Sequence, residues 1–344
     1  MWSPIRLRRE WMRWLATGLV MIFWIVSAQA AEELRSKPAS PAREWLDLGE
    51  WLGSYGLQGE WVEPGIRQRF KSAWTEIEFT HDSREILFNG LRVFLGDGCV
   101  RREGRLAISA VDARKHLGPL LRARDFAGSA RPVRRIVIDA GHGGKDRGTG
   151  NAELKLMEKT FTLDVARRLS AILRRQGFDV VMTREDDTYL ELRERARLTR
   201  SAAPDLFVSI HFNATSGKPH VRGTETYVLT PQYQRSTSSA QAEESDNDRQ
   251  AGNSADPWNA VLGWQMHRAL TRELGSIDRG LKRARFAVLR LIDCPGVLVE
   301  AGYLTNEAEA RQIATVSYRD RIAEAAANGI IAFADQVAAV VKDR

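Results

Sequence analysis

The pattern of apolar and polar positions divides the chain into two parts of different texture. Over residues 43–121, short apolar runs alternate with turns. Residues 85–88 and 91–95 are two such runs, and they flank Asn89-Gly90, a pair that accepts the positive φ of a tight hairpin turn. The sequence therefore predicts a small α+β module here, followed by a linker at residues 122–134.

From residue 135 onward, predicted strands alternate with longer predicted helices. The predicted strands are residues 135–140, 178–183, 205–210, 223–229, 286–289 and 296–299. The predicted helices are residues 157–176 and 189–203, with long helices at the C-terminus. Alternation of strands and helices is typical of an α/β sheet covered on both faces. We expect an α/β fold with a mainly parallel or mixed sheet over residues 135–344.

The first thirty residues have the composition of a secretory signal peptide. Four arginines precede an apolar stretch from Trp14 to Val26, and an Ala-x-Ala sequence ends at Ala30. The apolar stretch is short for a membrane span, because a helix rises about 1.5 Å per residue against a bilayer core of about 30 Å. We expect cleavage after Ala30, export to the periplasm or cell envelope, and no stable membrane span; an uncleaved anchor is the alternative. Residues 31–42 have the composition of a tether.

Composition narrows the class of protein. The chain has 344 residues, of which 43% are hydrophobic and 28% charged, and this excludes both disorder throughout and a multi-span membrane protein. Removal of the first thirty residues takes away four arginines and one glutamate, which lowers the net charge from +7 to +4. So small a charge does not indicate nucleic-acid binding. Cys99 and Cys294 are too few for a disulfide scaffold; we expect buried free thiols, with one bridge between them as the alternative.

One segment interrupts the α/β pattern. Residues 231–256 are rich in Ser, Gln, Glu and Asp and contain almost no large apolar residue. They cannot bury a core of their own. We expect a solvated surface loop, and a lid or regulatory insert beside the functional site is the alternative.

Candidate chemistry lies where predicted strands end. His142, His211 and Glu300 follow or end predicted strands, and Glu158 begins the helix after the first of these strands. In open α/β sheets, ligands bind outside the carboxyl ends of the strands, so we expect the four side chains at one edge. Two imidazoles and one carboxylate leave an open position on a tetrahedral zinc ion, as in hydrolytic sites. His142, Glu158 and His211 are therefore the candidate ligands, and Glu300 is the candidate proton carrier.

Each of these residues also has a purely structural interpretation. A single histidine at a strand end often has no ligand, and Glu158 can simply favour the positive end of its helix dipole. The coincidence at one edge favours the catalytic interpretation. His81, His116 and His267 lie in turn or helix contexts, and His220 is a weaker candidate for substrate contact. The chain has no Gly-x-Ser-x-Gly, Ser-x-x-Lys, phosphate-loop or His-Glu-x-x-His motif.

A series of short motifs runs in order along the second half of the chain. The first is Ile136-Val-Ile-Asp-Ala-Gly-His-Gly-Gly-Lys-Asp-Arg-Gly-Thr. The others are Met157-Glu-Lys, Met182-Thr-Arg, Ser209-Ile-His-Phe-Asn-Ala, Gly223-Thr-Glu-Thr-Tyr, Asp278-Arg-Gly-Leu-Lys and Val297-Leu-Val-Glu-Ala-Gly-Tyr-Leu-Thr-Asn. Over about residues 133–340, the chain resembles the catalytic domain of the zinc-dependent N-acetylmuramoyl-L-alanine amidases, the amidase-3 family.

This resemblance implies a reaction, a cofactor and a site. Such amidases hydrolyse the amide between the lactyl group of N-acetylmuramic acid and the L-alanine of the stem peptide, so peptidoglycan is the expected partner. The family's Zn²⁺ ligands map onto His142, Glu158 and His211, and its catalytic carboxylate maps onto Glu300. Glu153 is an alternative ligand, because the residues just before Glu158 depart from the family pattern.

Regulation and docking are also implied by resemblance. In some relatives, a segment placed like residues 231–256 blocks the zinc until an activator protein binds, and Glu243 or Glu244 would play that part here. The module at 43–121 faintly resembles the copper-amine-oxidase N-terminal-like domain of exported cell-wall proteins. It has no histidine cluster, so no copper is implied, and we expect cell-wall docking.

Two other functions remain open at this point. One is a zinc peptidase that cuts within the stem peptide. The other is a non-catalytic protein that binds peptidoglycan or regulates amidases on a retired fold. The second predicts loss of a ligand or of the carboxylate, whereas His142, Glu158, His211 and Glu300 are all present.

Overall fold

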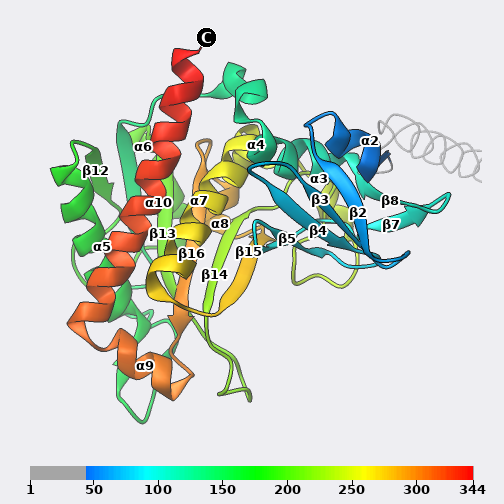
Figure 1. The fold of residues 1–344 in the computed structure, drawn as a ribbon. Coiled ribbons are helices and arrows are strands. Elements are labelled where there is room, and N and C mark those ends of the chain that lie inside the picture. The colour runs from blue at the N-terminus through cyan, green and yellow to red at the C-terminus, as the bar shows by residue number, and fades with distance from the viewer. Residues whose placement is uncertain (1–43, 344) are drawn as a thin grey trace, which may run out of the picture. The chain divides into compact units, whose positions relative to one another are not determined.

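The computed structural model describes residues 44–343. The predicted signal peptide (1–30) and tether (31–42) lie outside these residues. The described residues form one compact unit, in which helices line both faces of a central sheet (Figure 1).

The central sheet is mixed and has eleven strands among the described residues. In spatial order they are β12 (Asp179–Met182), β9 (Arg135–Ala140), β13 (Leu206–Asn213), β16 (Gly296–Tyr303), β14 (Thr224–Leu229), β15 (Asp278–Ala284), β6 (Leu91–Phe94), β5 (Glu85–Phe88), β4 (Glu76–Thr80), β3 (Arg67–Lys71) and β2 (Gln58–Glu63). Strands β12, β9, β13 and β16 are parallel, and β14 is antiparallel to β16 but parallel to β15. Strands β6 to β2 form an antiparallel meander. The expected α/β fold with a mixed sheet is confirmed.

The predicted module and the α/β region share this sheet. Strand β6 pairs in parallel with β15 through Val93 and Leu281. The predicted linker, 122–134, contains the 3₁₀ helix η3 (Ala123–Ser129), and the Ser129 hydroxyl accepts a hydrogen bond from the Trp258 indole at 3.0 Å. The two regions are thus in direct contact through both the sheet and this helix.

Smaller elements complete the structure. The minor sheets are β1 (Trp45–Asp47), β8 (Arg105–Ser109) and β7 (Val100–Arg102), and the pair β10 (Gly150–Asn151) and β11 (Leu156–Met157). The larger helices are α5 (Glu158–Arg175), α6 (Leu192–Ala202), α7 (Asp256–Leu274), α9 (Glu307–Ile313) and α10 (Val316–Lys342). The shorter ones are α2 (Leu48–Gly53), α3 (Ala110–Asp112), η2 (Ala113–Leu117), α4 (Gly118–Leu121), η4 (Glu244–Asn247), η5 (Ala251–Ala255) and α8 (Ala287–Arg290).

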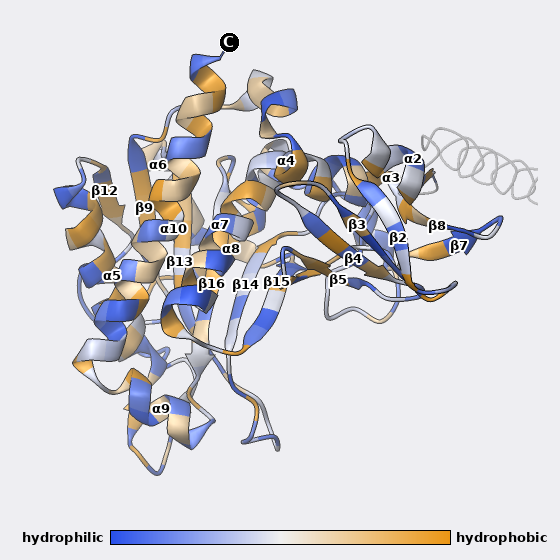
Figure 2. Cartoon of the chain, viewed as in Figure 1, coloured by the Kyte–Doolittle hydropathy of each residue, from blue (hydrophilic) through white to orange (hydrophobic). Residues whose placement is uncertain are grey.

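Side chains alternate between the two faces of the central strands, and each face packs against its own layer of helices. Ile136 and Ile138 of β9 belong to the large core under α5, α7 and α10, whereas Val137 packs with Phe207 of β13 in a second core that includes residues of α6 and α8. Strands buried on both faces are apolar throughout, and Figure 2 shows β9 as a largely apolar strand. Helices on both faces are therefore confirmed.

Helix α10 is long and apolar enough to span a membrane by length and composition. One side of it, however, is buried in the protein core, including Ile322, Ile330 and Phe333, and polar residues alternate with the apolar ones along the helix (Figure 2). Contacts with α5 and α7 explain the apolar side. We therefore interpret α10 as a core helix.

Several local predictions can be compared with the structure directly. The predicted hairpin is present: β5 and β6 are joined by Asn89 and Gly90, both with positive φ. Helix α5 ends just before Gly177, whose φ of +88° stops it. The predicted strand at 286–289 is wrong, because residues 287–290 form helix α8, and short apolar runs do not distinguish strand from helix.

Cys99 and Cys294 are both buried and free, as expected. Burial raises the pKa of each thiol to about 12. Neither is a reactive thiolate at neutral pH.

Candidate metal centre and active site

His142 lies in the glycine-rich turn that follows β9 and has a positive φ of 61°. Two buried arginines hold this turn through its carbonyl oxygens. Arg195 of α6 donates to the carbonyl of His142 at 2.6 Å, and Arg184 donates to that of Gly141 at 2.8 Å. Gly141 must lack a side chain, because a Cβ there would lie 2.3 Å from Cε1 of His211. The turn thus brings two imidazoles together.

Glu158 is the first residue of α5 and is buried. Its Oε1 accepts from the backbone amide of Phe212 at 3.0 Å, and its Oε2 accepts from that of Thr149 at 2.8 Å. Burial alone would raise its pKa, but hydrogen bonds from His142 and His211 outweigh this and hold the pKa well below the ordinary value. Glu158 is therefore a fixed anion.

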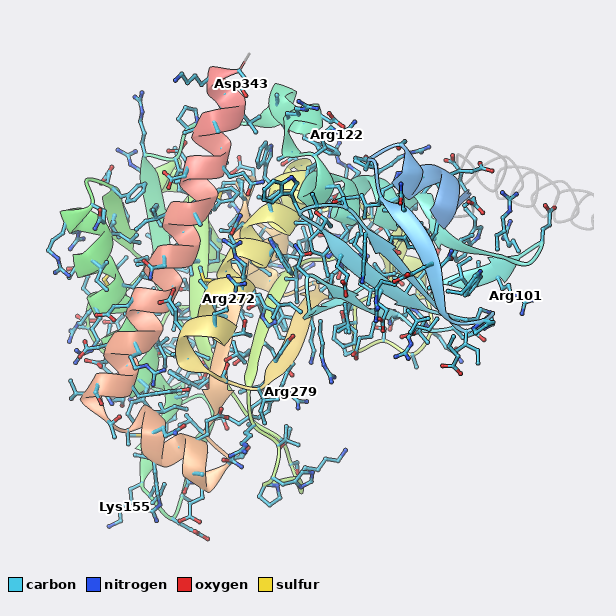
Figure 3. All side chains as sticks on the ribbon, in the orientation of Figure 1. Arg101, Arg122, Lys155, Arg272, Arg279 and Asp343 are labelled. Carbon is cyan, nitrogen blue, oxygen red and sulfur yellow. The ribbon has the colours of Figure 1, made fainter. Side chains whose placement is uncertain are left out.

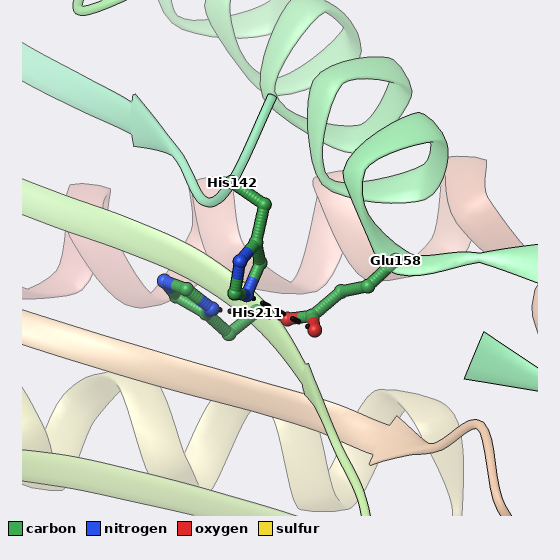
Figure 4. Close-up of side chains that lie close together, drawn as sticks. All are labelled: His142, Glu158 and His211. Carbon is green, nitrogen blue, oxygen red and sulfur yellow. Dashed lines mark hydrogen bonds and ion pairs between the residues drawn. The ribbon is translucent and has the colours of Figure 1, made fainter. Parts of the chain in front are cut away.

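The three predicted ligands converge on one point (Figure 4). Glu158 Oε2 lies 3.1 Å from His142 Nε2, and Glu158 Oε1 lies 3.0 Å from His211 Nδ1. One donor atom from each residue lies within 4.8 Å of the others. The rings of His142 and His211 are 4.9 Å apart and nearly perpendicular, so both present nitrogen atoms to the same space. The structure thus provides a group that can hold a metal ion.

Asp146 supports this group, and the sequence-based reasoning did not single it out. Its Oδ2 lies 2.8 Å from His142 Nδ1, the ring nitrogen that faces away from Glu158. Burial lowers the pKa of His142, but Glu158 and Asp146 outweigh this and raise it. A carboxylate behind a ligating histidine is common in metal sites, where it fixes the ring orientation. The spacing of four residues between His142 and Asp146 in the glycine-rich turn is the sequence feature that could have identified Asp146.

Glu300 lies on β16, directly beside His211 of β13 in the parallel register. The sequence predicted Glu300 at the end of its strand, but β16 continues to Tyr303, which pairs with Asn213 of β13. The Oε2 atom of Glu300 is buried and has no hydrogen-bond partner among the described residues. Burial raises the pKa of Glu300 well above the ordinary value, and the charges of Glu158 and Glu225 add to this.

All four predicted residues line one cavity of about 490 Å³. Its other walls combine polar groups with an apolar side formed by α8. The lining residues are Asp139, His142, Asp146, Thr149, Glu158, Tyr189, Leu190, Leu192, Arg195, His211, Phe212, Asn213, Ala214, Phe286, Ala287, Val288, Leu298 and Glu300. The cavity holds the candidate ligands and an unpaired carboxylate in one space.

Other predicted candidates lie elsewhere in the described part of the chain. Glu153 is exposed in the β10–β11 turn and does not belong to the metal-binding group. His220 is exposed in the loop between β13 and β14 and does not line the cavity. His267 is buried between Thr226 and Asp278.

No residue of the segment 231–256 lines the cavity. Its backbone carbonyls at residues 235, 236, 237 and 239 accept hydrogen bonds from Arg84 of the N-terminal module. Glu243 caps η4, and Asp246 in that helix pairs with Arg285. The segment is thus anchored against the module in this structure.

Beside Glu300 lies a second buried carboxylate that the sequence-based reasoning missed. Glu225 of β14 accepts hydrogen bonds from Lys282 at 2.6 Å, Arg279 at 3.0 Å and the hydroxyls of Tyr227 and Tyr303 at 2.7 Å. These contacts, above all the charge of Lys282, outweigh burial and lower its pKa. Its position in the Gly223-Thr-Glu-Thr-Tyr motif was the available signal.

Comparison with known proteins supports the same assignment. Residues 136–332, more than half of the chain, match the N-acetylmuramoyl-L-alanine amidase family. The chain belongs to this family. AmiA of Escherichia coli K12, named an N-acetylmuramoyl-L-alanine amidase, is 32% identical over 225 residues, which cover 58% of this chain and 76% of AmiA.

A second relative and one solved structure are also similar to this chain. LytC of Bacillus subtilis, named an N-acetylmuramoyl-L-alanine amidase, is 36% identical over 200 residues, which cover 58% of this chain. This chain spans only 35% of the length of LytC. The CwlD amidase of Clostridioides difficile was solved in complex with the GerS lipoprotein, and its structure matches this chain with a TM-score of 0.50 at 24% identity. The match covers 59% of this chain and 99% of the CwlD chain. That similarity shows the fold alone.

Proposed function

We propose that the chain is an exported, zinc-dependent N-acetylmuramoyl-L-alanine amidase that hydrolyses the bond between the lactyl group of N-acetylmuramic acid and L-alanine in peptidoglycan. The observation that carries this proposal is the cavity that joins His142, Glu158 and His211 to the unpaired carboxylate of Glu300 in a member of the amidase family. A carboxylate oxygen that is buried without a hydrogen-bond partner destabilises a fold, so a non-catalytic protein would not be expected to retain Glu300 Oε2 in this state.

The donor set fits zinc. Two imidazole nitrogens and one carboxylate oxygen are the ligands of hydrolytic zinc sites, and Asp146 orients the ring of His142 from behind. When bound, zinc would supply a Lewis acid that lowers the pKa of water towards about 7 and polarises the substrate carbonyl.

Glu300 moves the proton in this proposal. Its raised pKa makes it a stronger base than an exposed glutamate, so it takes a proton from the attacking water. It then gives this proton to the L-alanine nitrogen as the amide bond breaks. Arg195 and Arg184 keep the His142 turn in place during this step through their bonds to its carbonyls.

Digestion of purified sacculi by the mature chain tests the proposal, with and without a chelator and with mass analysis of the products. We expect chelator-sensitive release of stem peptides that begin with L-alanine. A cut between stem residues would favour the zinc peptidase, and zinc binding without release of any product would reject the amidase. An activator protein remains a prediction, and the packing of residues 231–256 against Arg84 gives it no support.

A further inference from the structure

The face of the sheet that carries Glu300 continues beyond the cavity. Glu225 of β14 lies opposite Glu300 in register, and Tyr227 pairs with Lys282 of β15. The intervening Thr226 hydrogen-bonds to helix α7 on the other face. Because side chains alternate along a strand, Glu225 and Tyr227 stand on the face opposite α7.

This face passes from the catalytic sheet into the N-terminal module. Leu281 and Val93 pair across the junction of β15 and β6, and both are fully buried in the core that includes α7. Their neighbours Lys282 and Phe94 therefore stand on the same face as Glu300. Lys282 Nζ lies 5.7 Å from the centre of the Phe94 ring, which joins the two regions directly.

Within the module, a row of paired residues extends this face to the far edge of the sheet. The registers align Arg92 with Leu87, Leu87 with Glu78, Glu78 with Arg69, and Arg69 with Glu60. From β16 to β2 the row crosses seven strand spacings, roughly 34 Å at about 4.8 Å each. Such a length suits an extended polymer better than a small molecule.

Aromatic side chains connect this row to the cavity. Phe286 lines the cavity and is 38% exposed, and its ring packs edge-on against Tyr227 at 5.2 Å. Beyond Tyr227 come Phe94 and then Leu87, which is 36% exposed. Figure 3 shows side chains along these strands, with Arg279 labelled on β15. Apolar groups are thus spaced along a mostly polar face.

The basic side chains on this face are paired with carboxylates. Each basic side chain lies within 4.0 Å of a carboxylate on the same face. The pairs are Arg67–Glu78, Arg69–Glu78, Lys71–Glu76, Arg92–Glu85 and Lys282–Glu225. A face whose cations are already paired is suited to a neutral polymer, whereas an anionic stem peptide requires unpaired cations.

We propose that this outer sheet face, formed by Tyr227, Lys282, Phe94, Leu87 and Arg92, binds the glycan strand of peptidoglycan and leads it to the Glu300 cavity. The inference rests on the proposed function, because that reaction places a glycan chain beside the scissile amide. Sugar rings present apolar C–H faces that pack on aromatic rings, and hydroxyl and N-acetyl groups that bond to paired charged side chains.

Binding to glycan strands stripped of their stem peptides tests this inference. Phe94→Ala removes the ring at the junction, and Leu87→Asp places a charge in the middle of the row. We expect each variant to bind about tenfold more weakly than the wild type, as for loss of one central contact. Trp74→Ala is the matched control, because Trp74 is 90% exposed in the same module but lies in the β3–β4 turn. It should bind like the wild type.

Three results would overturn the inference: wild-type affinity in both variants while their unfolding curves match the wild type, an equal loss in Trp74→Ala, or binding of free stem peptides in preference to stripped glycan. Failure of the proposed function is separately visible. A wild type that binds stripped glycan yet releases no peptide from sacculi supports the outer sheet face and rejects the amidase. Release of peptide from sacculi without binding of stripped glycan supports the amidase and rejects the outer sheet face as a glycan site.

Discussion

Glu158 and Glu300 face the same cavity but have opposite surroundings. Both oxygens of Glu158 are hydrogen-bonded, to two imidazoles and two backbone amides, whereas Oε2 of Glu300 has no partner among the described residues. The first arrangement stabilises an anion, and the second raises the affinity of the carboxylate for a proton. Two carboxylates with pKa values shifted apart can serve as ligand and proton carrier.

Glu300→Gln is expected to fold and to bind zinc with the wild-type stoichiometry, because the amide keeps the size of the side chain and Glu300 is not a ligand. Its turnover should fall by about 10²- to 10⁴-fold, the contribution of one proton-transfer group. Product release from sacculi and zinc content are the measurements. Glu153→Gln, in the exposed β10–β11 turn, is the control and should retain activity. Near-normal turnover of Glu300→Gln contradicts the assignment.

At the scale of elements, helix α7 begins with a buried acid. Asp256 accepts a hydrogen bond from the Asn253 side chain at 2.9 Å, and its carboxylate is 3.8 Å from Lys115. Burial raises its pKa to about 6, and the bond from Asn253 only partly opposes this shift. The folded state therefore holds this proton more tightly than the unfolded chain does.

Such a shift makes the stability of the fold depend on pH. Since the pKa is higher in the folded state, the stabilising contribution is complete below about pH 4 and is lost as the pH rises through about 6. The two-unit shift corresponds to roughly 3 kcal/mol of unfolding free energy. We expect Asp256→Asn to gain stability relative to the wild type between pH 4 and pH 7, measured by urea unfolding. Asp335→Asn, which removes an exposed carboxyl from α10, is the control. Parallel pH profiles for Asp256→Asn and the wild type would exclude this role.

At the scale of the whole molecule, a buried ion pair joins the module to the catalytic sheet. Asp112 of α3 and Arg283 of β15 are both fully buried, 2.8 Å apart. Asp112 also accepts from the Gly96 amide and the Ser109 hydroxyl, and Gln234 of the 231–256 segment contacts Arg283. The module, strand β15 and the segment 231–256 thus meet at the Asp112–Arg283 pair.

Removal of one partner leaves a buried charge uncompensated. Asp112→Ala should lower the free energy of unfolding by about 3–5 kcal/mol, and the double change Asp112→Leu with Arg283→Met should cost less than Asp112→Ala alone. Urea unfolding followed by tryptophan fluorescence measures both. We expect one cooperative transition, since the sheet is continuous through β6 and β15. Two separate transitions, with only one shifted by Asp112→Ala, would show that the module unfolds independently.

The sequence by itself determined the elements and the chemistry that depend on local pattern. Apolar runs of β9, β13 and β16 and the helical spacing of α5 identify an α/β sheet, because burial imposes these periods directly. This pattern also places His142, Glu158 and His211 together, because they lie at predicted ends of strands and helices and the carboxyl ends of parallel strands share one edge. Motif order then identified the family.

Tertiary structure alone decided what depends on contacts between distant residues. Pairing of β16 with β13 as far as Tyr303 placed Glu300 within its strand, and pairing of β15 with β6 merged the module with the catalytic sheet. The partners Asp146 and Glu225, and the anchoring of residues 231–256 by Arg84, arise from these contacts. No local period encodes which strand edges meet, because hydrogen bonding between backbones is nearly independent of side-chain identity.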